Sequence, residues 1–292
     1  MDKLFFIVNA TAGSGRSGKC FDQVRRELDK RGISYGCEFT QAPHHAEDLT
    51  RAALLRGEST IVAVGGDGTI NEIASVMCGN ATTMGILPFG TGNDLAKVLK
   101  LPTDPDGALE MLLNGTVRPM DAGMANDKFF INIAGLGFDV DVLVNTEKYK
   151  KHFNGMLPYM LGVINTLSHL RTLHITLTVD GKTIQKDSIL VAVGNGTHFG
   201  GGMKVTPLAD PFDGLFDVCL IEIMPMLKLL SLLPGFVNGK HLKSKQVHYF
   251  NATEIVVECD EPCMLDFDGE LGSSVPAKFT IIPGAINILV AK

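Results

Sequence analysis

The sequence has no long apolar run. Segments such as Ile61–Val64 and Ile281–Ile282 soon meet glycine, proline or charge, whereas a membrane-spanning helix needs about 18 apolar residues in succession. The start, Met1-Asp2-Lys3 followed by Leu4–Val8, also lacks the length and the small-residue cleavage site of a signal peptide. We therefore expect a cytoplasmic protein without a spanning helix.

The sequence also lacks an excess of positive charge. Its formal net charge is −6 and its pI is near 5.7, whereas nucleic-acid phosphates are bound through clustered Lys and Arg. We expect no nucleic-acid partner. One basic cluster, Lys240 to Lys245, follows the apolar segment Met226–Val237. This arrangement is typical of a core helix that ends in cations, and it is also compatible with contact to anionic lipid head groups.

Cysteines are few and scattered. Of the six, only Cys259 and Cys263 lie close together in the sequence, and no second Cys or His pair of matching spacing completes the ligand set of a zinc site. Because a cytosolic environment is reducing, we expect all of them to be free thiols.

The first part of the sequence alternates short apolar runs with helical patterns. This rhythm predicts a parallel β-sheet covered by helices. The expected strands are Leu4–Val8, Ser34–Phe39, Thr60–Val64 and Thr83–Leu87, and the expected helices are Phe21–Lys30, Ala46–Leu55, Asn71–Cys78 and Asp106–Asn114.

Beyond Asp121 the strand candidates follow one another closely, which predicts a mostly antiparallel β domain. The candidates are Phe129–Ile133, His174–Val179, Ser188–Gly194, Leu215–Ile223, Glu254–Glu258 and Lys278–Pro283, with one helix expected at Met156–Leu170. The predicted fold is an α/β N-terminal domain with a parallel sheet, residues 1–122, and a β-sandwich-like domain, residues 123–283. The tail, residues 284–292, is expected to return to the first domain.

A glycine-rich turn follows the first expected strand. Gly13 to Gly18 match the dinucleotide pattern G-x-G-x-x-G, but four residues separate the strand from Gly13, whereas a Rossmann turn follows its strand almost directly. The same residues nearly form a P-loop before Lys19, but Cys20 replaces the Ser or Thr that would bind Mg²⁺. The turn is suited to phosphate or is a plain loop, and a pyridine-nucleotide oxidoreductase stays an alternative.

The strongest local pattern is Gly65-Gly66-Asp67-Gly68-Thr69-Ile70-Asn71-Glu72, directly after Thr60–Val64. Glycines let backbone amides approach a ligand, and the N-terminus of the following helix attracts anions. We therefore expect a polyphosphate ligand at this loop. Asp67 would then need a divalent cation between itself and the phosphate, or a part in hydroxyl chemistry. The alternative for Asp67 is a simple turn or N-cap role.

A second turn of this kind, Pro88-Phe89-Gly90-Thr91-Gly92-Asn93-Asp94, also joins an apolar strand to a helix. Two such loops at the carboxyl ends of parallel strands converge on one crevice. Lys97, one helical turn further along, can reach back toward that crevice.

Two acidic clusters lie in the second half. Asp210 and Asp213 occupy a Pro/Gly turn, which indicates either a plain β-turn or oxygen ligands for a hard cation. Asp266, Asp268 and Glu270 alternate along a strand-like segment, so we expect all three to point to one face and Phe267 to the other. Crowding there would raise the pKa of a carboxylate toward that of a usable general base. A solvated strand face is the alternative.

Together these motifs resemble the catalytic family of diacylglycerol and sphingosine kinases, in its bacterial soluble diacylglycerol kinase and YegS-like branch. Asn9 to Gly13 resembles the first nucleotide loop, although Ala10 stands where proline is usual, and Thr40 followed by His45-Ala46 resembles the second. Further signatures extend the match along the chain, and they are Asp121 with Gly123, Asn132, Gly135 to Asp139 and Gly200 to Met203.

The resemblance implies an ATP-dependent lipid kinase that uses Mg²⁺ and converts diacylglycerol to phosphatidic acid, with an NAD-kinase-like first domain. It implies Glu270 or Asp268 as the general base, with Asp67 and Lys97 as further catalytic residues. It also implies a structural Mg²⁺ held by Asp210, Asp213 and the carbonyl of Leu215. The expected nucleotide-binding residues are Asn9, Ala10, Thr11, Ala12, Gly13, Thr40, Gly65, Gly66, Asp67, Gly68, Thr69, Ile70, Asn71, Glu72, Thr91, Asn93 and Asp94.

The expected partner is a lipid substrate collected by peripheral, transient contact with the membrane surface, and a homodimer is left open. NAD kinases and phosphofructokinases share the Gly-Gly-Asp-Gly loop, so that loop alone leaves a soluble-substrate kinase such as an NAD kinase as an alternative. A nucleotide-binding regulator without catalysis is a further one.

Overall fold

The computed structural model describes residues 4–153 and 157–292. The segment Met1-Asp2-Lys3 and the expected helix start at Met156 lie outside the described residues. In chain order, the first lobe contains β1 (Leu4–Val8), α1 (Arg16–Lys30), β2 (Tyr35–Phe39), α2 (His45–Leu55), β3 (Thr60–Gly65), α3 (Asp67–Met77), β4 (Thr83–Pro88), α4 (Asp94–Val98), α5 (Pro105–Asn114) and β5 (Thr116–Ala125).

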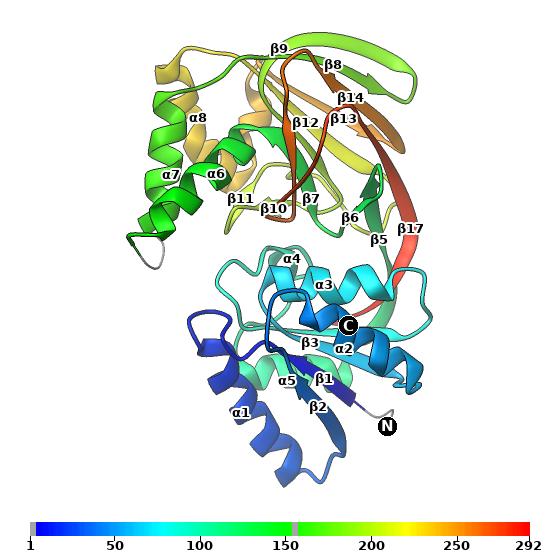
Figure 1. Ribbon diagram of the computed structural model, residues 1–292. Coiled ribbons are helices and arrows are strands. Elements are labelled where there is room, and N and C mark those ends of the chain that lie inside the picture. Colours follow the sequence, from blue (N-terminus) through cyan, green and yellow to red (C-terminus); the bar gives the residue numbers. More distant parts are fainter. Residues whose placement is uncertain (1–3, 154–156) are drawn as a thin grey trace.

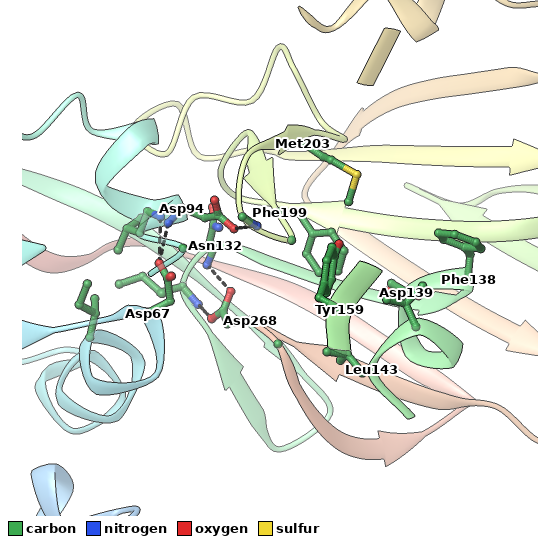
Figure 2. A pocket seen from close by; sticks show the side chains of 18 residues that line it. Asp67, Asp94, Asn132, Phe138, Asp139, Leu143, Tyr159, Phe199, Met203 and Asp268 are labelled. Atoms are coloured by element: carbon green, nitrogen blue, oxygen red, sulfur yellow. Dashed lines mark hydrogen bonds between the residues drawn. The ribbon is translucent and has the colours of Figure 1, made fainter. Parts of the chain in front are cut away.

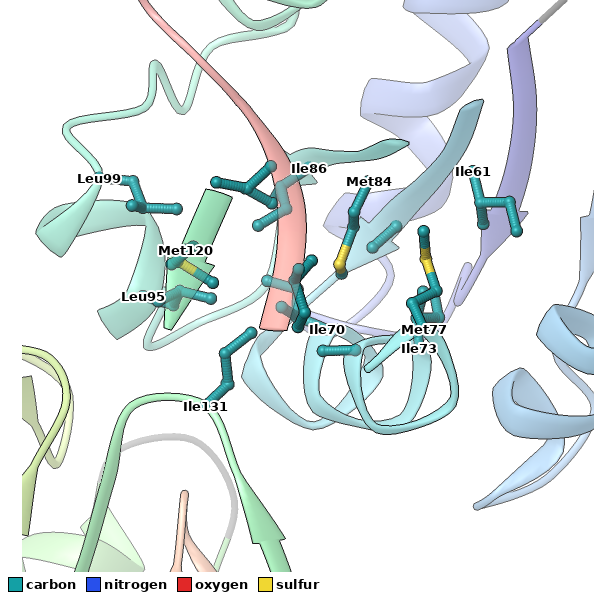
Figure 3. Packing of buried hydrophobic residues seen from close by; sticks show 14 of the residues in the cluster. Ile61, Ile70, Ile73, Met77, Met84, Ile86, Leu95, Leu99, Met120 and Ile131 are labelled. Atoms are coloured by element: carbon teal, nitrogen blue, oxygen red, sulfur yellow. The ribbon is translucent and has the colours of Figure 1, made fainter. Parts of the chain in front are cut away.

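The parallel sheet of the first lobe has the order β2-β1-β3-β4. Side chains alternate between its faces, as the period of a strand requires. Phe5 and Ile7 belong to the apolar cluster formed with α2 and α3, whereas Phe6 and Val8 belong to the cluster formed with α1 and α5. Figure 3 shows the first of these clusters between the sheet and α3. The predicted α/β class of this lobe is confirmed.

The second lobe is mostly β structure with three helices on one side (Figure 1). Its elements are β6 (Lys128–Phe130), β7 (Ile133–Gly137), α6 (Phe138–Lys150), α7 (Leu157–Ser168), β8 (Leu173–Val179), β9 (Lys182–Gly194), β10 (His198–Phe199), β11 (Met203–Lys204), β12 (Phe216–Glu222), α8 (Met226–Asn238), the 3₁₀ helix η1 (Lys240–Lys243), β13 (Val247–Ala252), β14 (Glu254–Cys259), β15 (Met264–Phe267), β16 (Glu270–Ser274) and β17 (Ala277–Val290).

The long strand β9 organises this lobe, because it pairs with β7, β8 and β12. The ring of Phe130 contacts those of Phe216 and Phe279 in the apolar core between the strands. A second apolar cluster includes Leu229 and Phe236 of α8. Among the described residues, no helix is long and apolar enough to cross a membrane.

The two lobes are joined by the antiparallel strands β5 and β17. The first part of β17 pairs with β14 of the second lobe, and Asn287 and Ile288 near its end pair in parallel with β4 of the first. The register with β5 shifts between Ile282 and Ile286, and Gly284 there has a φ of +61°. The C-terminal strand therefore ends in the sheet of the first lobe, and the predicted boundary at residue 122 falls inside β5.

Several predicted elements differ from the structure in their bounds. The helix expected at Phe21–Lys30 begins at Arg16, and the strand expected at Lys278–Pro283 is part of the longer β17. The expected strand Phe129–Ile133 is broken, because β6 ends at Phe130 and β7 begins at Ile133. The expected helix Asn71–Cys78 starts earlier, at Asp67, and its N-cap is Gly66 in an extended conformation. An acidic residue in a first turn suits the positive end of the helix dipole, which favours this earlier start.

Candidate active site

The carboxyl ends of β3 and β4 bring the two glycine loops into backbone contact. The Cα atom of Gly66 lies only 2.3 Å from the position that a Cβ on Gly90 would take, so no larger residue fits there. Asn93, in a left-handed conformation, donates from its side chain to the carbonyls of Pro88 at 2.9 Å and Gly90 at 3.1 Å. Asn93 therefore shapes the second loop from within.

Asp67 and Asp94 lie side by side at this junction. Oδ1 of Asp67 accepts the backbone N–H of Asp94 at 2.7 Å and that of Leu95 at 3.4 Å. Burial and the neighbouring Asp94 raise the pKa of the Asp67 carboxyl. Lys97 does reach this crevice, since its Nζ lies 2.9 Å from Oδ1 of Asp94. The fold thus brings two carboxylates and one cation together at this junction.

The loop after β1 packs against the first glycine loop. The side chain of Asn9 donates to the hydroxyl of Thr69 at 3.0 Å, and the hydroxyl of Thr11 donates to Asn9 at 2.9 Å. A Cβ on Gly13 would lie 2.8 Å from the carbonyl oxygen of Phe89, so this turn also reaches the second glycine loop. Three of the expected nucleotide loops therefore meet in one place.

The remaining expected nucleotide residues differ in their contacts and exposure. Ala10 contacts Gly18, the backbone N–H of Ala12 donates to the carbonyl of Asn9 at 3.3 Å, and that of Thr40 donates to Val8 at 2.9 Å. Thr91 is exposed and Ile70 is buried. The amide oxygen of Asn71 is buried without a partner among the described residues.

Glu72 has a partner in the neighbouring helix. Its carboxylate accepts the backbone N–H of His44 at 3.1 Å and that of Ala46 at 3.0 Å, both at the start of α2. It therefore supplies the side-chain acceptor that the first turn of a helix needs. Through this contact Glu72 holds the segment after Thr40 against α3.

The prediction that Asp266, Asp268 and Glu270 share one face of a strand is wrong. Asp268 and Gly269 both have positive φ, 53° and 94°, and they form the turn of a tight hairpin between β15 and β16. An Asp-Gly pair between two strands is the preferred sequence of such a turn, because both positions need left-handed backbone conformations. The three acidic groups consequently point to different surroundings.

Asp268 is held by the backbone of the second lobe. Its carboxylate accepts N–H groups from Ile131 at 2.7 Å, from Asn132 at 3.0 Å and from Ile133 at 2.9 Å. These bonds explain the break between β6 and β7, since the chain turns around this carboxylate. Burial raises the pKa of Asp268 to about 7, although the three N–H bonds act in the opposite direction.

Asp266 and Glu270 differ sharply in exposure. Asp266 is fully buried, its Oδ1 accepts the backbone N–H of Gly269 at 2.8 Å, and burial together with nearby Asp139 raises its pKa. Glu270 is exposed, and its Oε1 lies 3.8 Å from the position that a Cβ on Gly68 would take. Of the three groups, Glu270 is the one whose carboxylate lies next to Gly68 of the first lobe.

A cavity of about 180 Å³ lies between the lobes at this place. Figure 2 shows Asp67, Asp94, Asn132 and Asp268 gathered at one side of it. The other side is lined mainly by the apolar side chains of Phe138, Leu143, Tyr159, Phe199 and Met203. A smaller apolar chamber of about 50 Å³ adjoins it and shares Phe138, Phe199 and Met203.

The acidic turn expected to hold Mg²⁺ lies at the junction of the lobes. Asp121 of β5 accepts the backbone N–H of Gly214 at 2.7 Å and that of Gly284, also at 2.7 Å. Oδ1 of Asp213 accepts the N–H of Leu215 at 2.9 Å. Burial and the carboxylates of Asp210 and Asp121 raise the pKa of Asp213, so a cation here would relieve repulsion.

Metal binding by this turn stays a prediction. In residues 4–153 and 157–292, no three His, Cys, Asp or Glu side chains are grouped so that they could hold a metal ion. The expected ligand set has only two carboxylates, with the carbonyl of Leu215 as the third ligand, and is not a group of that kind.

The apolar wall of the cavity was missed by the sequence-based reasoning. Tyr159 comes from α7, where it is one of many apolar or aromatic residues, and Phe199 comes from a strand of two residues. Neither position carries a local pattern that marks it. The wall exists because α7 and the β10–β11 hairpin meet only in the folded chain.

Two family models match the chain. Residues 3–125 match the model described as the diacylglycerol kinase catalytic domain. Residues 132–290 match the model described as the YegS C-terminal NAD kinase beta sandwich-like domain. Together they account for nearly all of the described structure.

Similar proteins are named diacylglycerol kinases. The chain is 30% identical over 295 aligned positions to a diacylglycerol kinase of Bacillus subtilis, covering 100% of this chain and 97% of the relative. It is 31% identical to one of Mycobacterium tuberculosis, covering 98% and 94%. A crystal structure of a diacylglycerol kinase from Bacillus anthracis matches with a TM-score of 0.82 at 23% identity, over 99% of this chain and 97% of the other. That structural match supports the fold.

Proposed function

The chain belongs to the diacylglycerol kinase catalytic-domain family, and from this premise we propose that it transfers the γ-phosphate of ATP to a lipid hydroxyl, with diacylglycerol as acceptor and phosphatidic acid as product. The observation that carries the proposal is the position of Glu270 opposite Gly68. A carboxylate of the second lobe there faces the glycine-rich helix start of the first, beside a cavity with an apolar wall.

The nucleotide would lie on the loops of the first lobe. The start of α3 presents backbone N–H groups and the positive end of a helix dipole, which suit phosphate. A Cβ on Gly68 would meet only Glu270 within 4 Å, so the approach to this helix start is open. Asn9 and Thr69, joined by their side chains, hold the neighbouring loop in place.

The carboxylates of Asp67 and Asp94 fit a divalent cation that accompanies the nucleotide. Burial and repulsion between them raise the pKa of Asp67, which is the situation that a bound cation relieves. When bound, Mg²⁺ would neutralise charge on the phosphate oxygens. The chain's own contribution is to keep the two carboxylates adjacent through the N–H groups at the start of α4.

Glu270 is the better placed of the two expected bases. Asp268 already accepts three backbone N–H bonds, so most of its acceptor capacity is used in holding β7 and the hairpin turn. Glu270 begins β16 directly after that turn and is exposed toward Gly68. In the proposed reaction Glu270 takes the proton of the lipid hydroxyl, and Asp268 positions the hairpin that carries it.

The acyl part of the lipid would occupy the apolar side of the cavity and the adjoining chamber. Apart from Asp139, that chamber is lined mainly by apolar side chains of β7, β9, α7 and α8, among them Ile133, Ile189, Leu167, Leu229 and Phe236. Apolar burial stabilises an acyl chain by about 0.8 kcal/mol for each buried CH₂. The chamber therefore fits a hydrocarbon chain better than a soluble polar acceptor such as NAD.

The same helices offer a surface for peripheral membrane contact. Leu227 and Val237 of α8 are 82% and 65% exposed, and Ile164 of α7 is 58% exposed. Lys228 and Lys240, also exposed, flank the apolar residues of α8. Apolar side chains beside cations suit a bilayer with anionic head groups. We place the membrane contact on this surface, next to the chamber for the acyl chain.

The experiment that tests the proposed function compares acceptors. Transfer of labelled γ-phosphate is followed with dioctanoylglycerol in mixed micelles, with NAD and with no acceptor. The proposal expects labelled phosphatidic acid and only background label in the other two reactions. Labelled NADP would instead establish the soluble-substrate alternative, and hydrolysis without transfer would remove the kinase function.

A further inference from the structure

A loop of three glycines lies between the nucleotide loops and the apolar wall of the cavity. Gly200, Gly201 and Gly202, here called the glycine flap, connect β10 to β11 and have positive φ values of 60°, 84° and 135°. Among the described strands, β10 and β11 pair only with each other. The flap is thus the tip of a hairpin that the main sheet does not hold, and glycine gives its backbone unusual freedom.

A hydrogen bond to Asp94 fastens the flap to the first lobe. The backbone N–H of Gly201 donates to Oδ2 of Asp94 at 2.7 Å, while Oδ1 of the same carboxylate lies 2.9 Å from Nζ of Lys97. A hydrogen bond to a charged carboxylate is stronger than a neutral one. The base of the hairpin is held separately, because the side chain of Asn132 donates to the carbonyl of His198 at 2.7 Å.

The flap forms part of the cavity wall. Gly200 and Gly201 line the cavity together with Phe199 and Met203. A Cβ on Gly200 would lie 2.7 Å from the hydroxyl of Tyr159, so the flap backbone packs directly against α7. Figure 2 shows Asp94 on one side of this segment and Tyr159 on the other.

The cavity and its adjoining chamber are small for a lipid. The cavity has about 180 Å³ and the adjoining chamber about 50 Å³, whereas sites that enclose drug-sized ligands have roughly 300 to 1,000 Å³. A diacylglycerol with two acyl chains therefore needs the wall to move. The glycine flap is a part of the wall that the main sheet does not hold.

We infer that Asp94 is a positioning residue that clasps the glycine flap in a closed state, and that release of the flap enlarges the cavity for the acyl part of the lipid. The inference rests on the proposed function. Asp94 lies beside Asp67 in the nucleotide site, so the clasp links that site to the opening of the lipid cavity. Only the fraction of molecules with a released flap binds lipid, so the apparent dissociation constant equals the intrinsic one divided by that fraction.

A pair of alanine substitutions tests the clasp. Gly201→Ala and its control Gly181→Ala both place a Cβ that meets nothing within 4 Å, at φ values of 84° and 79°. Each carries the cost of a left-handed conformation for an L-residue. Only Gly201 lies in the flap, since Gly181 lies in the turn between β8 and β9.

The first measurement is amide hydrogen exchange of a peptide that covers residues 197–204. We expect exchange about fivefold to thirtyfold faster in Gly201→Ala and unchanged in Gly181→Ala. Asp94→Asn should also accelerate exchange, because an uncharged amide oxygen is a weaker acceptor for the N–H of Gly201 than the carboxylate is. Equal exchange in Gly201→Ala and Gly181→Ala would overturn the clasp.

The second measurement separates the two substrates. In Gly201→Ala the KM for dioctanoylglycerol should fall by a factor similar to the acceleration of exchange, while the KM for ATP stays unchanged. Faster exchange with an unchanged lipid KM would overturn the role of the flap as the gate. If wild type phosphorylates no lipid, the proposed function fails. In that case, amide exchange of the flap is measured with and without dioctanoylglycerol, in the absence of ATP. Faster exchange with the lipid supports the role of the flap as the gate, and unchanged exchange overturns it.

Discussion

Asp67 and Asp94 are joined by a hydrogen bond of 2.7 Å from the backbone N–H of Asp94 to Oδ1 of Asp67. The bond ties the helix start after the first glycine loop to the helix start after the second. It keeps two carboxylates adjacent, although burial and their mutual repulsion raise the pKa of Asp67. Such an arrangement has a cost in stability that a binding or catalytic role would explain.

For Asp67 we predict that Asp67→Asn lowers phosphate transfer by at least about a hundredfold and leaves the protein folded. The amide keeps an oxygen that can accept the N–H of Asp94, but it loses the charge. Asp67→Ala should in addition destabilise the protein by about 0.5–2 kcal/mol, because α4 loses its side-chain acceptor. Turnover and urea unfolding of both variants check this, and unchanged turnover in both would exclude Asp67 from the mechanism.

For the acidic turn we predict that Asp213→Ala loses a bound Mg²⁺ and lowers the melting temperature. The physical reason is that Asp213 lies near Asp210 and Asp121, and a cation would offset their repulsion at the junction of the lobes. Metal content of the purified protein and thermal unfolding with and without EDTA are the measurements. Asp127→Ala, in the turn between β5 and β6, is the control. A variant that matches wild type in both measurements contradicts the metal site.

For the membrane surface we predict that Leu227→Ser weakens sedimentation with vesicles that contain anionic lipid by about threefold to thirtyfold, because one large apolar side chain is lost from the contact. Leu55→Ser is a matched control, since Leu55 is 89% exposed on α2 and Leu227 is 82% exposed on α8. Equal effects of the two substitutions, or none, would place the contact elsewhere.

For Asp266 we predict a pH-dependent gain in stability in Asp266→Asn. Burial and Asp139 raise the pKa of Asp266 in the folded protein, so the folded state holds a proton that the unfolded chain releases above about pH 4. The contribution of protonated Asp266 to the free energy of unfolding is therefore fully present below that pH. It is lost as the pH rises toward the folded pKa.

The amide cannot ionise, and its oxygen still accepts the N–H of Gly269. Urea unfolding should show a difference between Asp266→Asn and wild type that grows with pH. Asp260→Asn, an exposed carboxylate before β15, is the control. A difference that is constant with pH contradicts the assignment.

Much of the first lobe could be predicted from the sequence because its signals are local. The apolar run Leu4–Val8 is a strand whose alternate residues face two helix layers, and the glycine loops at Gly65 and Gly90 lie where strand-to-helix turns were expected. Their convergence also follows from local information, since the carboxyl ends of neighbouring parallel strands meet at one edge.

The second lobe was harder because its site depends on turns and distant contacts. The alternation of Asp266, Asp268 and Glu270 suggested one strand, although Asp268-Gly269 is itself a hairpin signal. The bond between Asp94 and Gly201 joins residues 107 positions apart in the chain, and no local pattern marks it. The apolar wall at Tyr159 likewise arises only where α7 meets the β10–β11 hairpin.

The most direct test is single-turnover phosphate transfer to dioctanoylglycerol in micelles by wild type, Glu270→Gln and Asp268→Asn, with ATP affinity measured separately. Glu270→Gln should slow transfer by about a hundredfold to ten-thousandfold with ATP affinity and stability close to wild type. Asp268→Asn should slow transfer and also lower stability, because the carboxylate that accepts three backbone N–H bonds is altered. If both variants transfer phosphate within a few-fold of wild type, Glu270 is not the base, and Asp67 becomes the leading candidate.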